Sequence, residues 1–189
     1  MAKVSKEQAA RNRAHVVDTA SHLYREKGLD GIGIADVMRA SGLTHGGFYG
    51  QFASKDALAA ECVSMVAERS LAKWQALVAA APQDGFAAIV QDYVSARHRD
   101  APENGCALTT LSADAARRGG AIAAAMTEGL GELVNVLTDV VPDKDRQRAL
   151  AALAQMAGAI MLARAVDDPQ LSDDILRAAR DALTAANPG

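Results

Sequence analysis

Apolar side chains recur at every third or fourth position along most of this 189-residue chain. In the first such run, Val16, Ala20 and Leu23 fall on one face of a helix. No run alternates apolar and polar residues for long, and aromatic residues make up only 4% of the chain, so the usual marks of β-strands are missing. The pattern predicts an all-α fold.

Glycine, proline and capping residues divide this pattern into about nine helices. The first is expected over residues 6–27 and ends at Gly28, since glycine favours helix C-termini. A short third helix over 45–51 would be capped by Thr44, and Ser54 would cap the fourth. The other helices are expected around 35–41, after Cys106, and around 86–94, 122–140, 150–161 and 171–183.

Charge is unevenly distributed along the chain. The net charge is −3, but residues 1–55 carry +3 and residues 56–189 carry −6. A basic head on an acidic body is typical of a DNA-reading domain joined to another module, although chance variation of a few charges would look the same. We therefore expect a DNA-binding domain over 1–55 and a ligand-binding and dimerisation domain over 56–189.

The sequence also limits the class and location of the protein. It has no run of about 18 uncharged apolar residues, and its first residues lack the apolar core of a secretory signal. Its two cysteines, Cys62 and Cys106, do not make a disulfide framework. These features indicate a cytoplasmic protein without a membrane segment.

The segment SGLTHGGFYGQFASKDAL, residues 41–58, is the most informative stretch. A helix, a turn containing Gly42 and a second short helix make a helix-turn-helix pattern, whose second helix enters the DNA major groove. Gly46 and Gly47 would let the backbone approach the duplex closely. Each glycine costs about 1 kcal/mol in a helix, so a compensating role is expected.

The aromatic residues of this segment have different expected roles. Phe48 and Phe52 are four positions apart and would anchor the short helix to the core. Tyr49 and Gln51 would point toward the groove. Lys55, at the start of the next helix, would contact a phosphate.

GLTHGGFYGQFASKDAL resembles the signature of the TetR family of bacterial transcriptional regulators, as does the upstream pattern A-x-x-L-Y-R-E-K-G-L-D-G-I. The resemblance covers about residues 10–60. It implies that Thr44, His45 and Gly46 begin the recognition helix and that Tyr49, Gln51 and Lys55 touch phosphates.

The resemblance has two departures and several implications. Gly50 replaces a larger groove-facing residue, and Gly33 replaces a threonine cap, so direct base reading would rely on Thr44, His45 and the backbone. The family implies a homodimer that binds a near-palindromic DNA operator, with a C-terminal cavity for a small-molecule inducer. A repressor is the expected form.

Small side chains in two C-terminal helices indicate a dimer interface. AALAQMAGAIMLARA, residues 151–165, and the alanine-rich last helix permit close helix approach, and two such pairs would form a four-helix interface. Ordinary packing within one chain is the alternative. The candidate interface residues are Leu153, Ala157, Met161, Ile175 and Ala179.

Five residues are the main candidates for ligand binding or sensing: Cys106, Trp74, Met65, Tyr93 and Met126. Phe86, His98 and Met161 are further ligand candidates. Cys106 lies near a helix N-terminus, which lowers the pKa of a thiol, and some TetR-like repressors sense electrophiles or oxidants through a cysteine. A small buried core residue is the alternative for Cys106. Met and aromatic residues at helical spacing also usually fill a core.

Other protein classes find less support in the sequence. His15, His22 and His98 have no metal-ligand spacing, and no phosphate loop or catalytic triad is recognisable, so neither a metal nor a cofactor is expected. A helical enzyme and an architectural DNA-binding protein remain as alternatives. An enzyme would ignore DNA, and an architectural protein would not respond to a small molecule.

Overall fold

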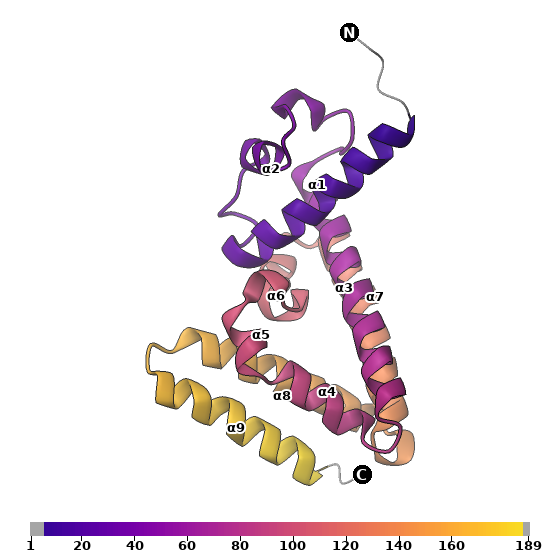
Figure 1. Ribbon diagram of the computed structural model, residues 1–189, viewed down its shortest axis with the longest axis vertical. Helices are drawn as coiled ribbons and strands as arrows, with labels where there is room; N and C mark the ends of the chain where they lie inside the picture. Colours follow the sequence, from indigo (N-terminus) through magenta and orange to yellow (C-terminus); the bar gives the residue numbers. More distant parts are fainter. Residues whose placement is uncertain (1–5, 187–189) are drawn as a thin grey trace.

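The computed structural model describes residues 6–186. The regular secondary structure of these residues consists of helices joined by turns and loops (Figure 1). The α-helices are α1 Lys6–Lys27, α2 Ile34–Ala40, α3 Lys55–Ala80, α4 Gly85–Tyr93, α5 Ala96–Asp100, α6 Ala107–Arg118, α7 Gly120–Val140, α8 Arg146–Ala165 and α9 Pro169–Ala186. Short 3-10 helices lie at His45–Gly47, Pro102–Asn104 and Pro142–Lys144. The predicted all-α class is confirmed. Within residues 6–186, no helix has both the length and the hydropathy to cross a bilayer.

The head consists of α1, α2 and the segment 41–54, at the top of Figure 1. Gly28 ends α1 as predicted, with φ +74° and its N–H donating to the carbonyl of Tyr24 at 2.8 Å. Ser54 caps α3, because its side chain accepts from the N–H of Ala57 at 3.0 Å. The capping logic of the sequence therefore holds at both of these helix ends.

The predicted helix over 45–51 is wrong in detail. Only His45–Gly47 is helical, as a single 3-10 turn, and turns continue through Gln51. Thr44 precedes the turn, but its side chain makes no capping hydrogen bond. Three glycines between 46 and 50 explain the short turn, since glycine is the poorest helix former after proline. The helix count nevertheless reaches nine within residues 6–186, because α5 was not predicted.

Helix α3 connects the two halves of the molecule and packs along α7 (Figure 1). The first half of α3 contributes Leu58 and Cys62 to the head cluster of buried side chains, whereas Trp74 belongs to the body cluster. Near the middle of α3, a Cβ atom added to Gly129 of α7 would lie 2.4 Å from the Cβ of Ala67. The absence of a side chain at Gly129 thus sets the closest approach of these two helices.

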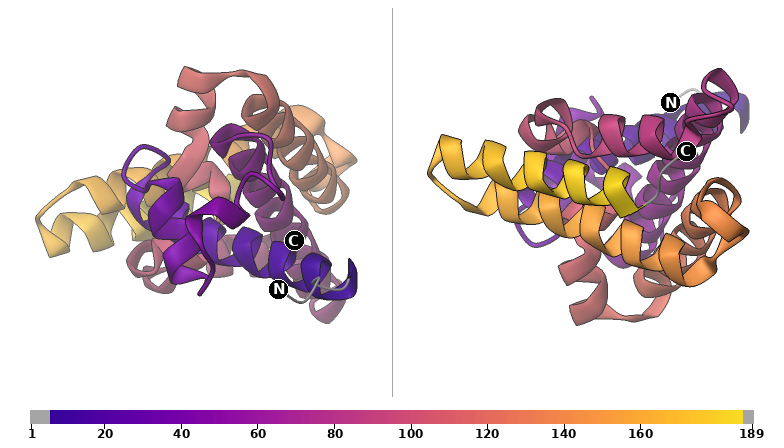
Figure 2. Two further views of the ribbon diagram at one scale, coloured as in Figure 1. Left: turned by 90° about the horizontal axis from the view of Figure 1, so that it is seen from above. Right: turned by 90° about the horizontal axis from the view of Figure 1, so that it is seen from below.

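The body is formed by α4 to α9 around the second half of α3. Helices α8 and α9 lie side by side as a hairpin, seen in yellow and orange from below in Figure 2. The apolar side chains of α4, α7, α8 and α9 enclose the body cluster, which includes Ile89, Leu137, Met156, Ile160 and Leu176. This arrangement places α9 on the outside of the molecule.

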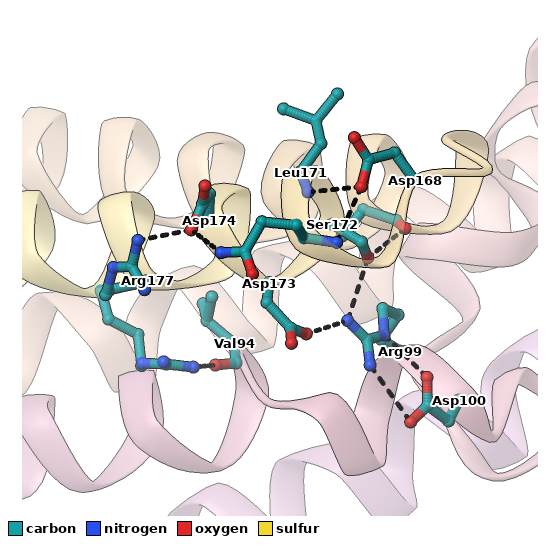
Figure 3. Close-up of polar contacts among 12 residues, drawn as sticks. Val94, Arg99, Asp100, Asp168, Leu171, Ser172, Asp173, Asp174 and Arg177 are labelled. Carbon is teal, nitrogen blue, oxygen red and sulfur yellow. Dashed lines mark hydrogen bonds and ion pairs between the residues drawn. The ribbon is translucent and has the colours of Figure 1, made fainter.

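One polar cluster, here called the Arg99 clasp, joins α5 to the start of α9 (Figure 3). Arg99 Nη1 donates to Ser172 Oγ at 2.9 Å and pairs with Asp173 at 2.6 Å, and Arg99 Nε pairs with Asp100 at 2.7 Å. Hydrogen bonds to Asp100 and then to Asp173 raise the pKa of the Arg99 guanidinium. This arginine is thus neutralised by two carboxylates at the protein surface.

Candidate functional sites

The first candidate site is the head tip, residues 44–51, which presents polar and aromatic groups to solvent. Thr44, His45 and Gly46 are exposed, and Tyr49 is 66% exposed. A Cβ atom added to Gly46 would meet no atom within 4 Å, and its φ is not positive. Nothing inside the described chain therefore requires glycine at this position, and the space beside it is open.

Two buried phenylalanines hold the head tip in place. Phe48 and Phe52 are 0% and 3% exposed, and their ring centroids lie 5.4 Å apart, as the four-residue spacing predicts. The guanidinium of Arg13 lies over the Phe52 ring at 4.7 Å. Tyr49 packs edge-on against Phe48 at 5.3 Å, so this exposed ring has a defined orientation.

Two other predicted DNA contacts lie differently. The side-chain amide of Gln51 turns inward, where its Nε2 donates to the carbonyl of Gly47 at 3.1 Å and its Oε1 is buried without a partner in the described chain. Lys55 is half-buried, with its Nζ 5.9 Å from the centroid of the Tyr24 ring. Gln51 therefore supports the tip from within in this conformation.

The second candidate site is a cavity of about 300 Å³ in the body, between α3, α4 and α5. It brings together three of the five main ligand candidates, Trp74, Tyr93 and Cys106. Met65 instead packs against the head cluster, and Met126 packs between the two clusters, so neither lines this cavity. The other lining residues are Ser70, Lys73, Asp92, Arg97, His98, Ala101, Asn104 and Gly105.

His98, one of the further ligand candidates from the sequence, organises the wall of the cavity. Its Nδ1 lies 2.8 Å from the carbonyl of Tyr93, and its Nε2 accepts from the backbone N–H of Cys106 at 3.1 Å. The neutral tautomer with a proton on Nδ1 satisfies both bonds. Burial lowers the pKa of His98 to about 4, so the ring stays uncharged.

Cys106 differs from the predicted reactive thiolate. It is the N-terminal flanking residue of α6, as expected, but it is only 7% exposed, and burial raises the pKa of its thiol. Desolvation outweighs the effect of the helix N-terminus here, so the thiol is protonated at neutral pH. Cys62 is fully buried, with its Sγ 3.4 Å from the carbonyl of Val17, as a core residue should be.

A set of polar contacts, here called the junction, joins the head to the body beside this cavity. Arg25 of α1 donates through Nη1 to the carbonyl of Gly105 at 2.6 Å. The buried carboxylate of Asp114 accepts from the N–H of Leu29 at 3.3 Å. Arg164 of α8 holds the helices on both sides of Gly105. It donates to the carbonyls of His98 and Arg99 in α5, at 2.5 and 2.9 Å, and to Thr109 Oγ1 in α6, at 3.0 Å.

The predicted dimer residues divide between the inside and the outside of the α8–α9 hairpin. Leu153 and Ala179 are buried within the chain, while Ala157 and Ile175 are half-buried and Met161 is 45% exposed. The largest apolar side chains that the hairpin leaves exposed are Leu150, Met161, Leu162 and Leu171. The outer face of the hairpin thus has an apolar character that the chain itself does not cover.

Residues 16–62, which form most of the head and the start of α3, match the family model of the bacterial regulatory proteins of the tetR family. The match to this family thus covers the head and the start of α3, about a quarter of the chain. The HTH-type transcriptional regulator AcrR of Shigella flexneri is 31% identical over 61 residues, which are 32% of this chain and 28% of AcrR. The matched segment therefore spans little more than a quarter of that relative.

Solved structures extend the similarity in fold to the whole chain. The reduced form of NemR from E. coli superposes with a TM-score of 0.79 at 19% identity, covering 94% of this chain and 98% of NemR. A TetR-family transcriptional regulator from Cytophaga hutchinsonii gives a TM-score of 0.78 at 22% identity over 100% of both chains. The described chain thus shares the all-helical fold of these structures over nearly its whole length.

Proposed function

We propose that this chain is a homodimeric, cytoplasmic repressor of the TetR family that binds a near-palindromic DNA operator and is released by a small molecule. The observation that carries the proposal is the head tip, where exposed Tyr49 and His45 flank an unobstructed Gly46 on a base of buried phenylalanines. A rigid tip of this kind can enter the major groove and bring its backbone close to phosphates.

The residues of the head tip supply suitable chemistry for DNA. Thr44, His45 and Tyr49 carry exposed hydrogen-bonding groups that can reach base edges or phosphate oxygens. Lys55, although it lies near Tyr24, sits at the N-terminus of α3, where free N–H groups favour an anion. Gln51 would contact a phosphate only by leaving its bond to Gly47.

The α8–α9 hairpin is the proposed dimer interface. The exposed Leu150, Met161, Leu162 and Leu171 would pair with the same residues of a second copy, since a two-fold interface uses one surface twice. Such a dimer would present two head tips to two half-sites of an operator. Leu153 and Ala179 would support this interface from inside the chain.

The cavity around Trp74 is the proposed inducer site, with Tyr93 and Cys106 as contacts. Modification of Cys106 is a second candidate trigger, because its thiol lies on the cavity wall. Its raised pKa makes reaction with an electrophile slow until the molecule is bound beside it. Electrophile treatment that still released DNA from a Cys106→Ser variant would exclude this trigger.

The proposed DNA role is tested first by a gel shift on DNA flanking the protein's own gene, at stated salt and with excess competitor DNA. A discrete band is expected, whereas an enzyme would give none. An architectural protein would shift all fragments alike and would not respond to cavity ligands.

Variants of the head tip locate the DNA contact. Tyr49→Ala and Gly46→Val should weaken binding by about tenfold or more, because one removes a contact and the other adds bulk at the closest approach. Gln83→Ala and Gly131→Val serve as matched controls, since Gln83 is exposed far from the head and Gly131 also has open space around it. Full DNA affinity in both tip variants would overturn the assignment of the head tip.

A further inference from the structure

A second cavity of about 170 Å³ adjoins the first, on the side of the head. The two cavities share four lining residues, Ser70, Lys73, Asn104 and Gly105. The second is also lined by His22, Arg25, Val66 and Arg69. The two adjoining cavities are here called the cleft. Its inner end carries Trp74, and its other end, at the junction with the head, is rich in cations.

Arg25 is the central group of this cationic end. It is only 6% exposed, and its hydrogen bonds go to neutral oxygens: Nε to the carbonyl of Ser21 at 2.9 Å and Nη1 to the carbonyl of Gly105 at 2.6 Å. The contact of Nη2 with Ser21 Oγ, at 3.5 Å, is at the outer limit for a hydrogen bond. Since a guanidinium has five N–H donors, at least two of them remain for a ligand.

The neighbouring cations already have counter-ions, whereas Arg25 has none within residues 6–186. Arg69 pairs with Asp18 at 2.8 Å, and Lys73 pairs with Asp92 at 2.5 Å. Burial and the positive charge of Arg69 lower the pKa of the Arg25 guanidinium. A buried cation without a carboxylate partner is unfavourable, so an anion entering beside Arg25 would be strongly favoured.

The inner end of the cleft has a different chemistry. Trp74 and Tyr93 meet edge-to-face with ring centroids 5.8 Å apart, and both are almost fully buried. The Tyr93 hydroxyl is buried without a hydrogen-bond partner of ordinary geometry in the described chain, and its polar neighbour is the weakly bonding thiol of Cys106. A flat apolar group with one acceptor atom would fit this end.

We propose that the cleft binds an organic carboxylate with an aromatic body, the carboxylate on Arg25 and the ring against Trp74 and Tyr93. The proposal rests on the proposed function in one respect, since it names the chemical class of the effector. A carboxylate bound to the free donors of Arg25 would draw the guanidinium away from the carbonyl of Gly105. Binding would thereby weaken one of the bonds that hold α1 of the head to the body.

The test compares two probes of the same shape, 3-phenylpropanoate and its uncharged amide, 3-phenylpropanamide. Trp74 is the sole tryptophan of the chain and lines the cleft, so its fluorescence reports binding directly. Wild-type protein should bind the carboxylate at least about tenfold more tightly than the amide, as expected for charge-assisted hydrogen bonds. Equal affinities, or no saturable response to the carboxylate, would overturn the proposal.

Variants of Arg25 test whether this side chain is the source of the preference for the carboxylate over the amide. Arg25→Gln should bind both probes equally, and Arg25→Lys should keep part of the preference because it keeps the charge without the planar fork. The control Arg146→Gln removes an exposed arginine outside the cleft and should bind like wild type. A folded Arg25→Gln variant with an intact preference would overturn the role of Arg25, and the wild-type comparison does not depend on how that variant folds.

A further pair of probes tests the inner end of the cleft. 4-Oxo-4-phenylbutanoate has a ketone acceptor where 4-phenylbutanoate has a methylene group, and it should bind more tightly than 4-phenylbutanoate to the wild type but not to Tyr93→Phe. The gel shift on the same preparations separates the two proposals. Specific DNA binding without a carboxylate preference would overturn the anion site alone, and a carboxylate preference without DNA binding would overturn the regulator alone.

Discussion

The Arg99 clasp and the junction both use arginine to join segments that lie far apart in the sequence, but the partners differ in charge. Arg99 bonds to the carboxylates of Asp100 and Asp173 at the surface. Arg25 and Arg164 bond to carbonyl and hydroxyl oxygens beside a cavity, and neither forms an ion pair within residues 6–186. In the clasp, two carboxylates balance the charge of the arginine. In the junction, the charge of the arginines is not balanced by a carboxylate of the described chain and is available to an anionic ligand.

The largest expected effect on stability is at Arg164, where one side chain satisfies three oxygens. Arg164→Leu should lower the free energy of unfolding by about 2–4 kcal/mol, because the carbonyls of His98 and Arg99 at the partly buried end of α5 lose their donor. Urea unfolding would measure the loss. The exposed Arg146→Leu should cost little, and a similar loss in both variants would contradict the special role of the junction.

Acid should weaken the junction through His98. Its pKa is about 4 in the folded protein and near 6.5 when unfolded, so between these values only the unfolded chain takes up the proton. Stability from this group is present above pH 6.5 and falls by about 3 kcal/mol as the pH drops to 4.

Urea unfolding from pH 7 to 4 would measure this effect. The slope of stability against pH should be shallower in His98→Gln than in the wild type, since the remaining acid sensitivity comes from other groups. His15→Gln changes an exposed histidine and should keep the wild-type slope. Identical slopes in all three proteins would show that His98 does not stay neutral in the fold.

A smaller effect is expected at Gly105, where the loop passes the His98 ring. An added Cβ would lie 2.8 Å from that ring, so Gly105→Ala should destabilise by about 1–3 kcal/mol through overpacking. Gly131→Ala, in open space within α7, should instead stabilise by a few tenths of a kcal/mol to about 1 kcal/mol. Thermal unfolding of the two variants should therefore shift in opposite directions.

The smallest effect is expected at the clasp. Arg99→Gln should cost no more than about 1 kcal/mol, because surface ion pairs contribute little and water screens them. High salt should shrink the difference from wild type, whereas the Arg164→Leu loss should persist. Arg177→Gln breaks an exposed pair with Asp174 one turn away in α9 and serves as the matched control. A salt-independent loss at Arg99 would remove the contrast between the two sites.

Local signals in the sequence predicted much of the fold. Gly28 and Ser54 end and begin helices as expected, because each acts on its own backbone neighbours. The burial of Phe48 and Phe52, which hold the head tip in place, was also predicted correctly from their four-residue spacing. The prediction of a third helix over 45–51 was wrong because the low helix propensity of Gly46, Gly47 and Gly50 outweighed the spacing of the apolar residues.

The candidate sites depend on contacts that no local pattern reports. Arg25 and Gly105 are 80 positions apart, and their bond exists only because α6 packs beneath the head. Cys106 was expected to be acidic from its helix position, but its burial depends on the surrounding elements. Small residues in α8 and α9 indicated close packing without showing which face Leu153 would take.

The contact between Ala67 and Gly129 has a mechanical consequence. It lies near the midpoint of α3, a rod about 40 Å long with one end in the head and the other beside the cavity. Because the two helices cannot approach more closely there, a tilt of α3 against α7 would pivot at this point. With such a pivot, a small displacement of α3 near Trp74 would move the head in the opposite direction. A bulkier residue at 129 would force the two helices apart and remove the pivot.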